Sequence, residues 1–141
     1  MAWAPAAAMS VGPFHFAMRV YWEDTDAAGI VFYANYLKFF ERARTEWLRS
    51  FGFEQERLRA EAGIAFVVTE TSVRYRRPAR LDDVLAVSVA VRRLGQASLD
   101  VAQEARRADE LLASGTIRIG CVELGTFRPR RFPDEILSSL R

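Results

Sequence analysis

Residues 21–51 read YWEDTDAAGIVFYANYLKFFERARTEWLRSF, and their pattern indicates how the rest of the chain is arranged. Its second half places apolar residues at steps of three and four with charged residues between them, which predicts one amphipathic helix of about 17 residues. Gly52 is the expected stop, and a helix of that length is about 25 Å long, enough to cross a small sheet. The expected apolar face consists of Tyr36, Leu37, Phe40, Ala43, Trp47, Leu48 and Phe51.

The first half of the stretch is an acidic turn. Glu23, Asp24 and Asp26 lie within four residues, and Gly29 follows, whose missing Cβ lets the backbone take the positive φ of a tight turn. Asn35 is the expected N-cap of the helix, because its side chain can accept a hydrogen bond from a first-turn N–H. The unpaired N–H groups at such a helix start favour a carboxylate or a developing oxyanion nearby.

Outside this stretch, alternating apolar and β-branched residues predict strands. The expected strands are 14–22, 66–76, 84–93, 98–107 and 111–123, and short helical segments are expected at 54–62 and 134–140. The last three strands are joined by short connections, which favour an antiparallel meander because parallel strands need long crossovers. The predicted fold class is α+β, with one curved antiparallel sheet wrapped around one long helix.

Composition limits the organisation of the chain. With 141 residues, half of them hydrophobic, it is expected to form a single domain over residues 14–141 after a disordered tail over residues 1–13. The net charge is only +2, with acids and bases interspersed, so the protein is not expected to have the strong positive electrostatic potential that attracts nucleic acid. The single Cys121 allows no internal disulfide, and no secretory signal or membrane span is apparent, so a cytoplasmic protein is expected.

The chemistry available to this chain is narrow. His15 is the only histidine, and no metal-ligand spacing or glycine-rich phosphate loop occurs, so neither a metal nor another cofactor is expected. Carboxylates would therefore have to serve as the general acid, general base or nucleophile of any reaction. From spacing alone, however, the acidic turn is read as turn-forming residues and solvated charges.

A resemblance changes that balance. The segment EDTDAAGIVFYANYLKFFERARTEWL at 23–48 resembles the signature of the 4-hydroxybenzoyl-CoA thioesterase family of hot-dog-fold proteins. It is especially similar to the acyl-CoA thioesterases associated with the Tol-Pal system, as are FVV at 66–68, YRRPARLDD at 75–83 and RPRRFP at 128–133. The likeness covers essentially everything after the expected tail.

The resemblance implies a homodimer or homotetramer that hydrolyses acyl-CoA, with active sites at subunit interfaces. It implies that Asp26 is catalytic, as nucleophile or general base, and that the backbone N–H of Tyr33 is the oxyanion donor. Tyr33 stands where Tol-Pal-associated members usually carry histidine and hydroxybenzoyl-CoA enzymes carry tyrosine, so the acyl group stays open between aliphatic and aromatic. An association with Tol-Pal proteins rests on the resemblance alone.

Arginine suits the phosphates of CoA, and three arginines are candidates for that contact: Arg92, Arg93 and Arg128. They can equally be ordinary exposed side chains. Two other functions remain as alternatives. A non-catalytic acyl-CoA-binding or scaffold protein would bind the ester without turnover, whereas a nucleic-acid binder is disfavoured because no aromatic-interleaved basic patch is present. Neither nucleic acid binding nor membrane insertion is expected.

Overall fold

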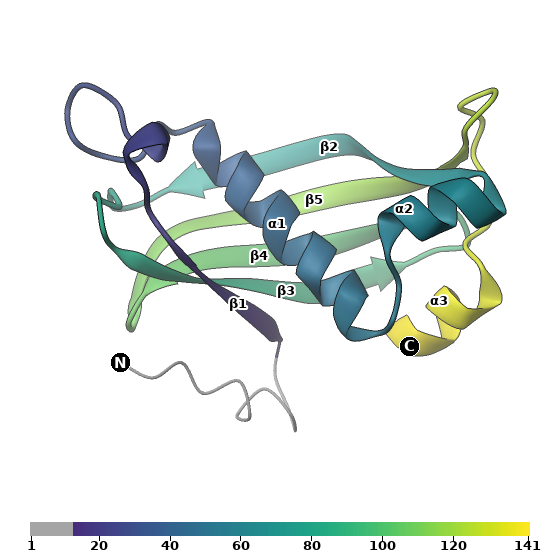
Figure 1. The fold of residues 1–141 in the computed structure, drawn as a ribbon. Helices are drawn as coiled ribbons and strands as arrows, with labels where there is room; N and C mark the ends of the chain where they lie inside the picture. The colour runs from purple at the N-terminus through teal and green to yellow at the C-terminus, as the bar shows by residue number, and fades with distance from the viewer. Residues whose placement is uncertain (1–12) are drawn as a thin grey trace.

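The structure is a computed structural model and describes residues 13–141. A long helix lies across one face of an antiparallel sheet (Figure 1). In chain order the elements are β1 (Phe14–Arg19), the 3₁₀ turn η2 (Trp22–Asp24), α1 (Asn35–Ser50), α2 (Gln55–Arg57), the π-helical turn η3 (Leu58–Ala62), β2 (Ile64–Tyr75), β3 (Val84–Leu94), β4 (Ser98–Arg107), β5 (Glu110–Glu123) and α3 (Asp134–Leu140).

Over residues 13–141 the strands form one five-stranded sheet in the order β1-β3-β4-β5-β2, with every neighbouring pair antiparallel. The predicted meander is therefore confirmed as β3-β4-β5. The register shifts between Val68 and Glu70, between Val91 and Arg93, and between Ala105 and Arg106. Such bulges bend a strand and increase its twist, which helps the sheet to curve around α1.

The core lies between α1 and the inner face of the sheet. Alternate residues of the central strands are at most 7% exposed there, namely Leu85, Val87, Val89, Leu99, Val101, Ala105, Ala113, Ile117, Ile119 and Cys121. From the helix they meet Tyr36, Phe39, Phe40, Ala43, Trp47 and Leu48. Each fully buried large apolar side chain stabilises the fold by about 1.5–3 kcal/mol, so this interface dominates stability.

The apolar stripe of the helix is narrower than predicted. Leu37 is 44% exposed and Phe51 is 41% exposed, whereas Leu48 is 7% exposed. Leu48 lies near the C-terminal helix, since it shares a cavity with Ile136 of α3.

Two local predictions near the acidic turn are wrong. The first strand ends at Arg19 rather than Trp22, because Asp24 donates its N–H to the carbonyl of Tyr21 at 3.0 Å and folds the chain into η2. Asn35 is the first helical residue rather than the cap, and its side-chain amide instead donates to the Asp24 carbonyl at 2.8 Å. Predicted short helices at 54–62 and 134–140 are confirmed.

The predicted tail over residues 1–13 falls, apart from Pro13, outside the described residues. Within the described chain, no helix is both long enough and apolar enough to cross a bilayer.

Gly115 offers a test of the packing between helix and sheet. A Cβ at this position would meet the Ser72 carbonyl oxygen at 3.1 Å and the Phe40 ring at 3.2 Å. Both neighbours are held, one by the β2–β5 ladder and the other by complete burial. We expect Gly115→Ala to lower the free energy of unfolding by about 1–3 kcal/mol, measured by urea denaturation.

Gly120→Ala is the matched control in the same strand. Its Cβ would lie 3.6 Å from the Thr69 methyl group and 3.9 Å from a Val67 methyl group, which are ordinary contacts. This variant is expected to be as stable as wild type or slightly more stable. Equal losses in both variants would contradict the packing argument.

Candidate active site

The loop between η2 and α1 is closed by its own backbone. Thr25 and Val31 form an antiparallel bridge, and the Asp26 N–H donates to the Ile30 carbonyl at 2.8 Å. The Gly29 N–H donates back to the Asp26 carbonyl at 3.0 Å, and Gly29 has φ +81°, in the region that favours glycine. A Cβ at Gly29 would meet nothing within 4 Å, so the backbone conformation rather than space selects glycine.

The Asp26 side chain is exposed and half engaged. Its Oδ1 accepts a hydrogen bond from the Ala28 N–H at 2.8 Å, as a turn-forming aspartate does. Its Oδ2 accepts none from the rest of the described chain. One carboxylate oxygen is thus held in place while the other is free to meet a ligand.

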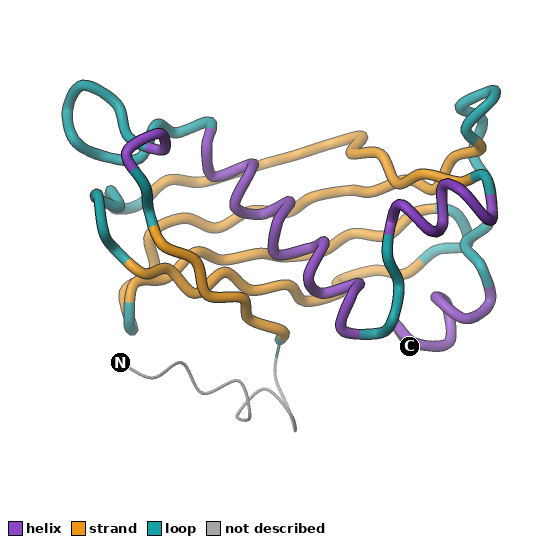
Figure 2. The backbone as a smooth tube through the Cα atoms, viewed as in Figure 1, coloured by secondary structure: helices purple, strands orange, loops and turns teal. Residues whose placement is uncertain are grey.

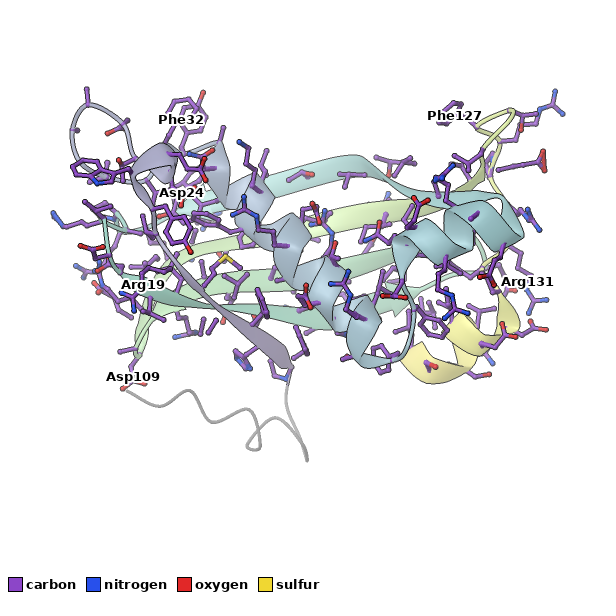
Figure 3. All side chains as sticks on the ribbon, viewed as in Figure 1. Arg19, Asp24, Phe32, Asp109, Phe127 and Arg131 are labelled. Carbon is purple, nitrogen blue, oxygen red and sulfur yellow. The ribbon has the colours of Figure 1, made fainter. Side chains whose placement is uncertain are left out.

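Asp24 fastens the two ends of the loop. It is only 5% exposed, and its Oδ2 accepts the Tyr21 N–H at 2.8 Å. Its carbonyl accepts two further donors, the Phe32 N–H at 2.9 Å and the Asn35 amide at 2.8 Å. Figure 3 shows Asp24 and Phe32 together at one end of the molecule. The acidic turn and the start of α1 are therefore tied directly to each other.

Tyr33 lies at the end of this loop, just before α1. Within residues 13–141, the backbone N–H groups of Tyr33 and Ala34 find no acceptor. They therefore remain open at the positive end of the helix dipole. Tyr33 is 62% exposed, and its phenol ring meets Tyr75 edge-on, with ring centroids 6.0 Å apart.

The segment before β3 supports the loop from behind. The Val31 N–H donates to the Ala79 carbonyl at 2.8 Å, and Ile30 forms a bridge with Arg80. The Ala79 N–H donates in turn to the Tyr36 hydroxyl at 3.3 Å. Burial raises the pKa of the Tyr36 phenol, so it stays neutral at physiological pH and acts as a fixed structural acceptor.

The three candidate arginines lie elsewhere. Arg92 and Arg93 are near the end of β3, which begins beside the loop and runs away from it (Figure 1). Arg128 follows Phe127, which lies at the opposite end of the molecule from Asp24 (Figure 3). Loops gather at both of these ends (Figure 2). Within one chain, the structure therefore brings Asp26 and Tyr33 into one loop and leaves the arginines remote from it.

The arginines also differ in their contacts. Arg93 pairs with Asp100 at 3.2 Å and donates to the Ser98 hydroxyl at 2.8 Å, so it already braces the β3–β4 turn. Two donors, Arg118 and Arg93, lower the pKa of the Asp100 carboxyl to about 2. The Arg92 and Arg128 side chains are exposed and form no ion pair within the described chain.

Sequence reasoning missed the roles of Asp24 and Asn35. The sequence pattern does not distinguish Asp24 from its acidic neighbours, although it is the buried member of the group. A polar residue at a helix start is a signal for Asn35, but its partner is the Asp24 carbonyl rather than the first turn of the helix.

Comparison with known proteins places the chain in a family. The model of the Thioesterase-like superfamily matches residues 20–140. The acyl-CoA thioesterase YbgC of Haemophilus influenzae is 44% identical over 123 residues, covering 87% of this chain and 90% of that protein. The acyl-CoA thioester hydrolase YbgC of Escherichia coli is 40% identical over 134 residues, covering 94% and 99%.

A solved structure agrees. The probable thioesterase from Bartonella henselae superimposes with a TM-score of 0.83 at 34% identity, covering 86% of this chain and all of that one. The expected α+β architecture is thereby confirmed. The chain belongs to the thioesterase-like superfamily and has its hot-dog fold.

Proposed function

We propose that this chain hydrolyses an acyl-CoA thioester to a free acid and CoA, with Asp26 as nucleophile or general base and the Tyr33 N–H as oxyanion donor. The coarse activity follows from family membership and from the thioesterase relatives. The assignment of residues is supported by one observation. An exposed, half-free carboxylate and an open helix-start N–H belong to a single loop that Asp24 fastens.

The loop suits two routes of hydrolysis. In one route, the free oxygen of Asp26 attacks the thioester carbonyl, the C–S bond breaks, and water then cleaves the mixed anhydride. In the other route, Asp26 takes a proton from a water molecule that attacks the same carbonyl. Either route puts negative charge on the carbonyl oxygen, which the Tyr33 N–H would stabilise. A thiol has a pKa of about 8.5, so the thiolate leaves without a strong general acid.

A second subunit would complete the site. β2 is an edge strand, and its middle residues 68–72 are exposed, including Val68 at 48%. An exposed edge with unpaired backbone groups is a ready template for pairing with another chain. We propose a homodimer or homotetramer; light scattering of the purified protein should give two or four times the 16.0 kDa chain mass, and a monomer would argue against it.

We further propose that Arg92, Arg93 and Arg128 contact the phosphates of CoA. Arginine binds phosphate through paired N–H donors, and Arg92 and Arg128 have no carboxylate partner within the described chain. Since all three are remote from Asp26 in one chain, this part of the proposal requires that they act on the active site of another subunit.

The deciding experiment is free-thiol release from a panel of aliphatic and aromatic acyl-CoAs. Turnover with part of the panel would support the proposal and rank the acyl groups. Measurable binding of the esters without turnover of any of them would favour the alternative, a non-catalytic acyl-CoA-binding or scaffold protein on the same fold.

Asn35 is expected to position the catalytic loop without touching the substrate. Asn35→Ala removes the hydrogen bond to the Asp24 carbonyl, which keeps its second donor from Phe32. We expect kcat to fall about tenfold with KM nearly unchanged, because small displacements of reacting groups are costly. The free energy of unfolding should fall by about 1 kcal/mol.

Asn35→Asp keeps the size of the side chain but places a carboxylate against the Asp24 carbonyl. It should impair kcat at least as much as Asn35→Ala. Wild-type kcat in both variants would show that the contact is structural only.

A further inference from the structure

An apolar cavity lies between the second half of α1, the inner face of the sheet and α3. Its volume is about 50 Å³. Its walls come from α1, from the three strands β2, β4 and β5 and from α3, and include Trp47, Leu48, Phe66, Leu99, Ile136 and Leu140. Figure 1 shows α3 beside the C-terminal end of α1, far from the loop that holds Asp26. Arg44 at the cavity lies nine residues beyond Asn35, a rise of about 13 Å along the helix.

Arg44 is the cationic group of this cavity. Its Nη1 donates to the Gln103 side-chain oxygen at 3.0 Å. Gln103 is fully buried on β4, and its amide nitrogen donates to the carbonyls of Phe40 at 3.0 Å and Ser88 at 3.2 Å. Both the oxygen and the nitrogen of the Gln103 side-chain amide are therefore hydrogen-bonded. It holds the Arg44 guanidinium in one place without neutralising its charge.

The remaining N–H groups of Arg44 are open. They donate to nothing in residues 13–141, and no carboxylate oxygen of that part of the chain lies within 4 Å of them. No sealed side-chain nitrogen or oxygen in the described chain lacks a hydrogen-bond partner, so the unpaired nitrogens of Arg44 keep contact with solvent and can be reached by a solute. Burial lowers the pKa of Arg44, yet a guanidinium stays charged at neutral pH.

Glu41 also lines the cavity, but its carboxylate forms no ion pair with Arg44. Its Oε2 accepts the Thr45 hydroxyl at 2.6 Å, and Thr45 also accepts the Gln55 amide at 3.0 Å. Glu41 is therefore held on the exposed rim, where its charge raises the pKa of Arg44 against the larger effect of burial but forms no ion pair with it. Partly desolvated arginines usually have a carboxylate partner, and Arg44 has none from the described chain.

We propose that this cavity is a binding site for a short aliphatic carboxylate, separate from the catalytic loop. The carboxylate would pair with the free N–H groups of Arg44, and the alkyl chain would fill the apolar cavity. Arginine matches a carboxylate with two parallel N–H donors, which an ammonium group cannot do. An apolar cavity offers a water molecule few hydrogen-bond partners, so an alkyl group is the more favourable occupant.

The volume limits the length of the ligand. A water-sized group needs about 10–15 Å³ of such space, so a cavity of about 50 Å³ holds about four groups of methylene size. Butyrate and isovalerate fit this limit, whereas octanoate exceeds it. Free acids are also products of thioester hydrolysis, but the site does not depend on that activity.

The test is an NMR titration of the Asp26→Asn variant with butyrate, in the absence of any CoA ester. The indole N–H signal of Trp47 should shift and saturate, while that of the exposed Trp22 should not move. Isovalerate should behave like butyrate, and the neutral analogue butyramide should bind at least tenfold more weakly. Because the ligand is a free acid and the variant is expected to have lost turnover, butyrate binding is measured independently of the proposed hydrolysis.

Variants separate the charge from the cavity. Arg44→Met should weaken butyrate binding at least tenfold, whereas Arg42→Met, an exposed arginine on the same helix, should leave it unchanged. Leu140→Trp, which fills the cavity and keeps Arg44, should also abolish binding. Unchanged affinity in Arg44→Met, or butyrate shifts that spare Trp47, would overturn the proposal. Octanoate binding as tightly as butyrate would overturn the size limit.

Discussion

Asp26→Asn is expected to lower kcat for acyl-CoA hydrolysis by about a hundredfold or more while leaving the fold intact. Asparagine keeps a side-chain oxygen that can accept the Ala28 N–H, so the turn is preserved. It lacks the negative charge that either attacks the thioester or takes the proton from water. Since the side chain is exposed, the substitution buries no new polar group. Thiol release and urea denaturation, measured on the same preparation, test both halves of the prediction.

Glu23→Gln is the matched control. Glu23 is an exposed acid in the same turn, three residues before Asp26. Its neutralisation should leave kcat within about twofold of wild type, because surface charges at a distance are screened. Near wild-type turnover in Asp26→Asn would remove Asp26 from the mechanism. Equal losses in both variants would point to the net charge of the loop rather than to one carboxylate.

The sheet could be predicted from sequence because its determinants are local. Residues on one face of a strand recur with period two, and the alternation in Leu85, Val87 and Val89 continues into the neighbouring strands. Short turns between these strands allow only antiparallel pairing. The residues that the fold buries are therefore the ones whose alternation is already visible within each strand segment alone.

The contacts that shape the candidate site are not local. The hydrogen bond from Asn35 to the Asp24 carbonyl joins residues eleven positions apart, and no periodicity reports it. The exposure of Leu37 is equally invisible, because the helical pattern does not report which residues of one face the rest of the fold covers. Helical spacing predicts which residues share a face, but not where along the helix another element lies on it.

The two interpretations of the acidic turn meet in the structure. From spacing alone, Asp26 is a turn former, and its Oδ1 does accept the Ala28 N–H. The resemblance to thioesterases implies a catalytic role for the same carboxylate, the role proposed above, and its Oδ2 has no hydrogen-bond partner in the described chain. Turn formation holds the side chain in one orientation, so the structural role would prepare the carboxylate for the chemical role.

Tyr33→Pro is expected to lower kcat by about a hundredfold to a thousandfold, the usual effect of losing one oxyanion donor. Proline removes the backbone N–H, which has no acceptor in residues 13–141, together with the ring that meets Phe32 and Tyr75. The Tyr33 carbonyl would still accept the Tyr36 N–H. Tyr33 lies in the turn before α1, and proline is tolerated at turn positions. Thiol release gives the kinetic effect, and circular dichroism with urea denaturation checks the fold.

Tyr33→Ala separates the backbone from the phenol. It keeps the N–H and removes the exposed ring, so kcat should stay within about tenfold of wild type if the N–H is the donor. A folded Tyr33→Pro variant with normal turnover would exclude this N–H as the donor. A Tyr33→Ala variant as impaired as Tyr33→Pro would assign the effect to the side chain. A large loss of kcat with proline together with a small one with alanine would show that the oxyanion donor does not depend on side-chain identity, as expected for a backbone N–H.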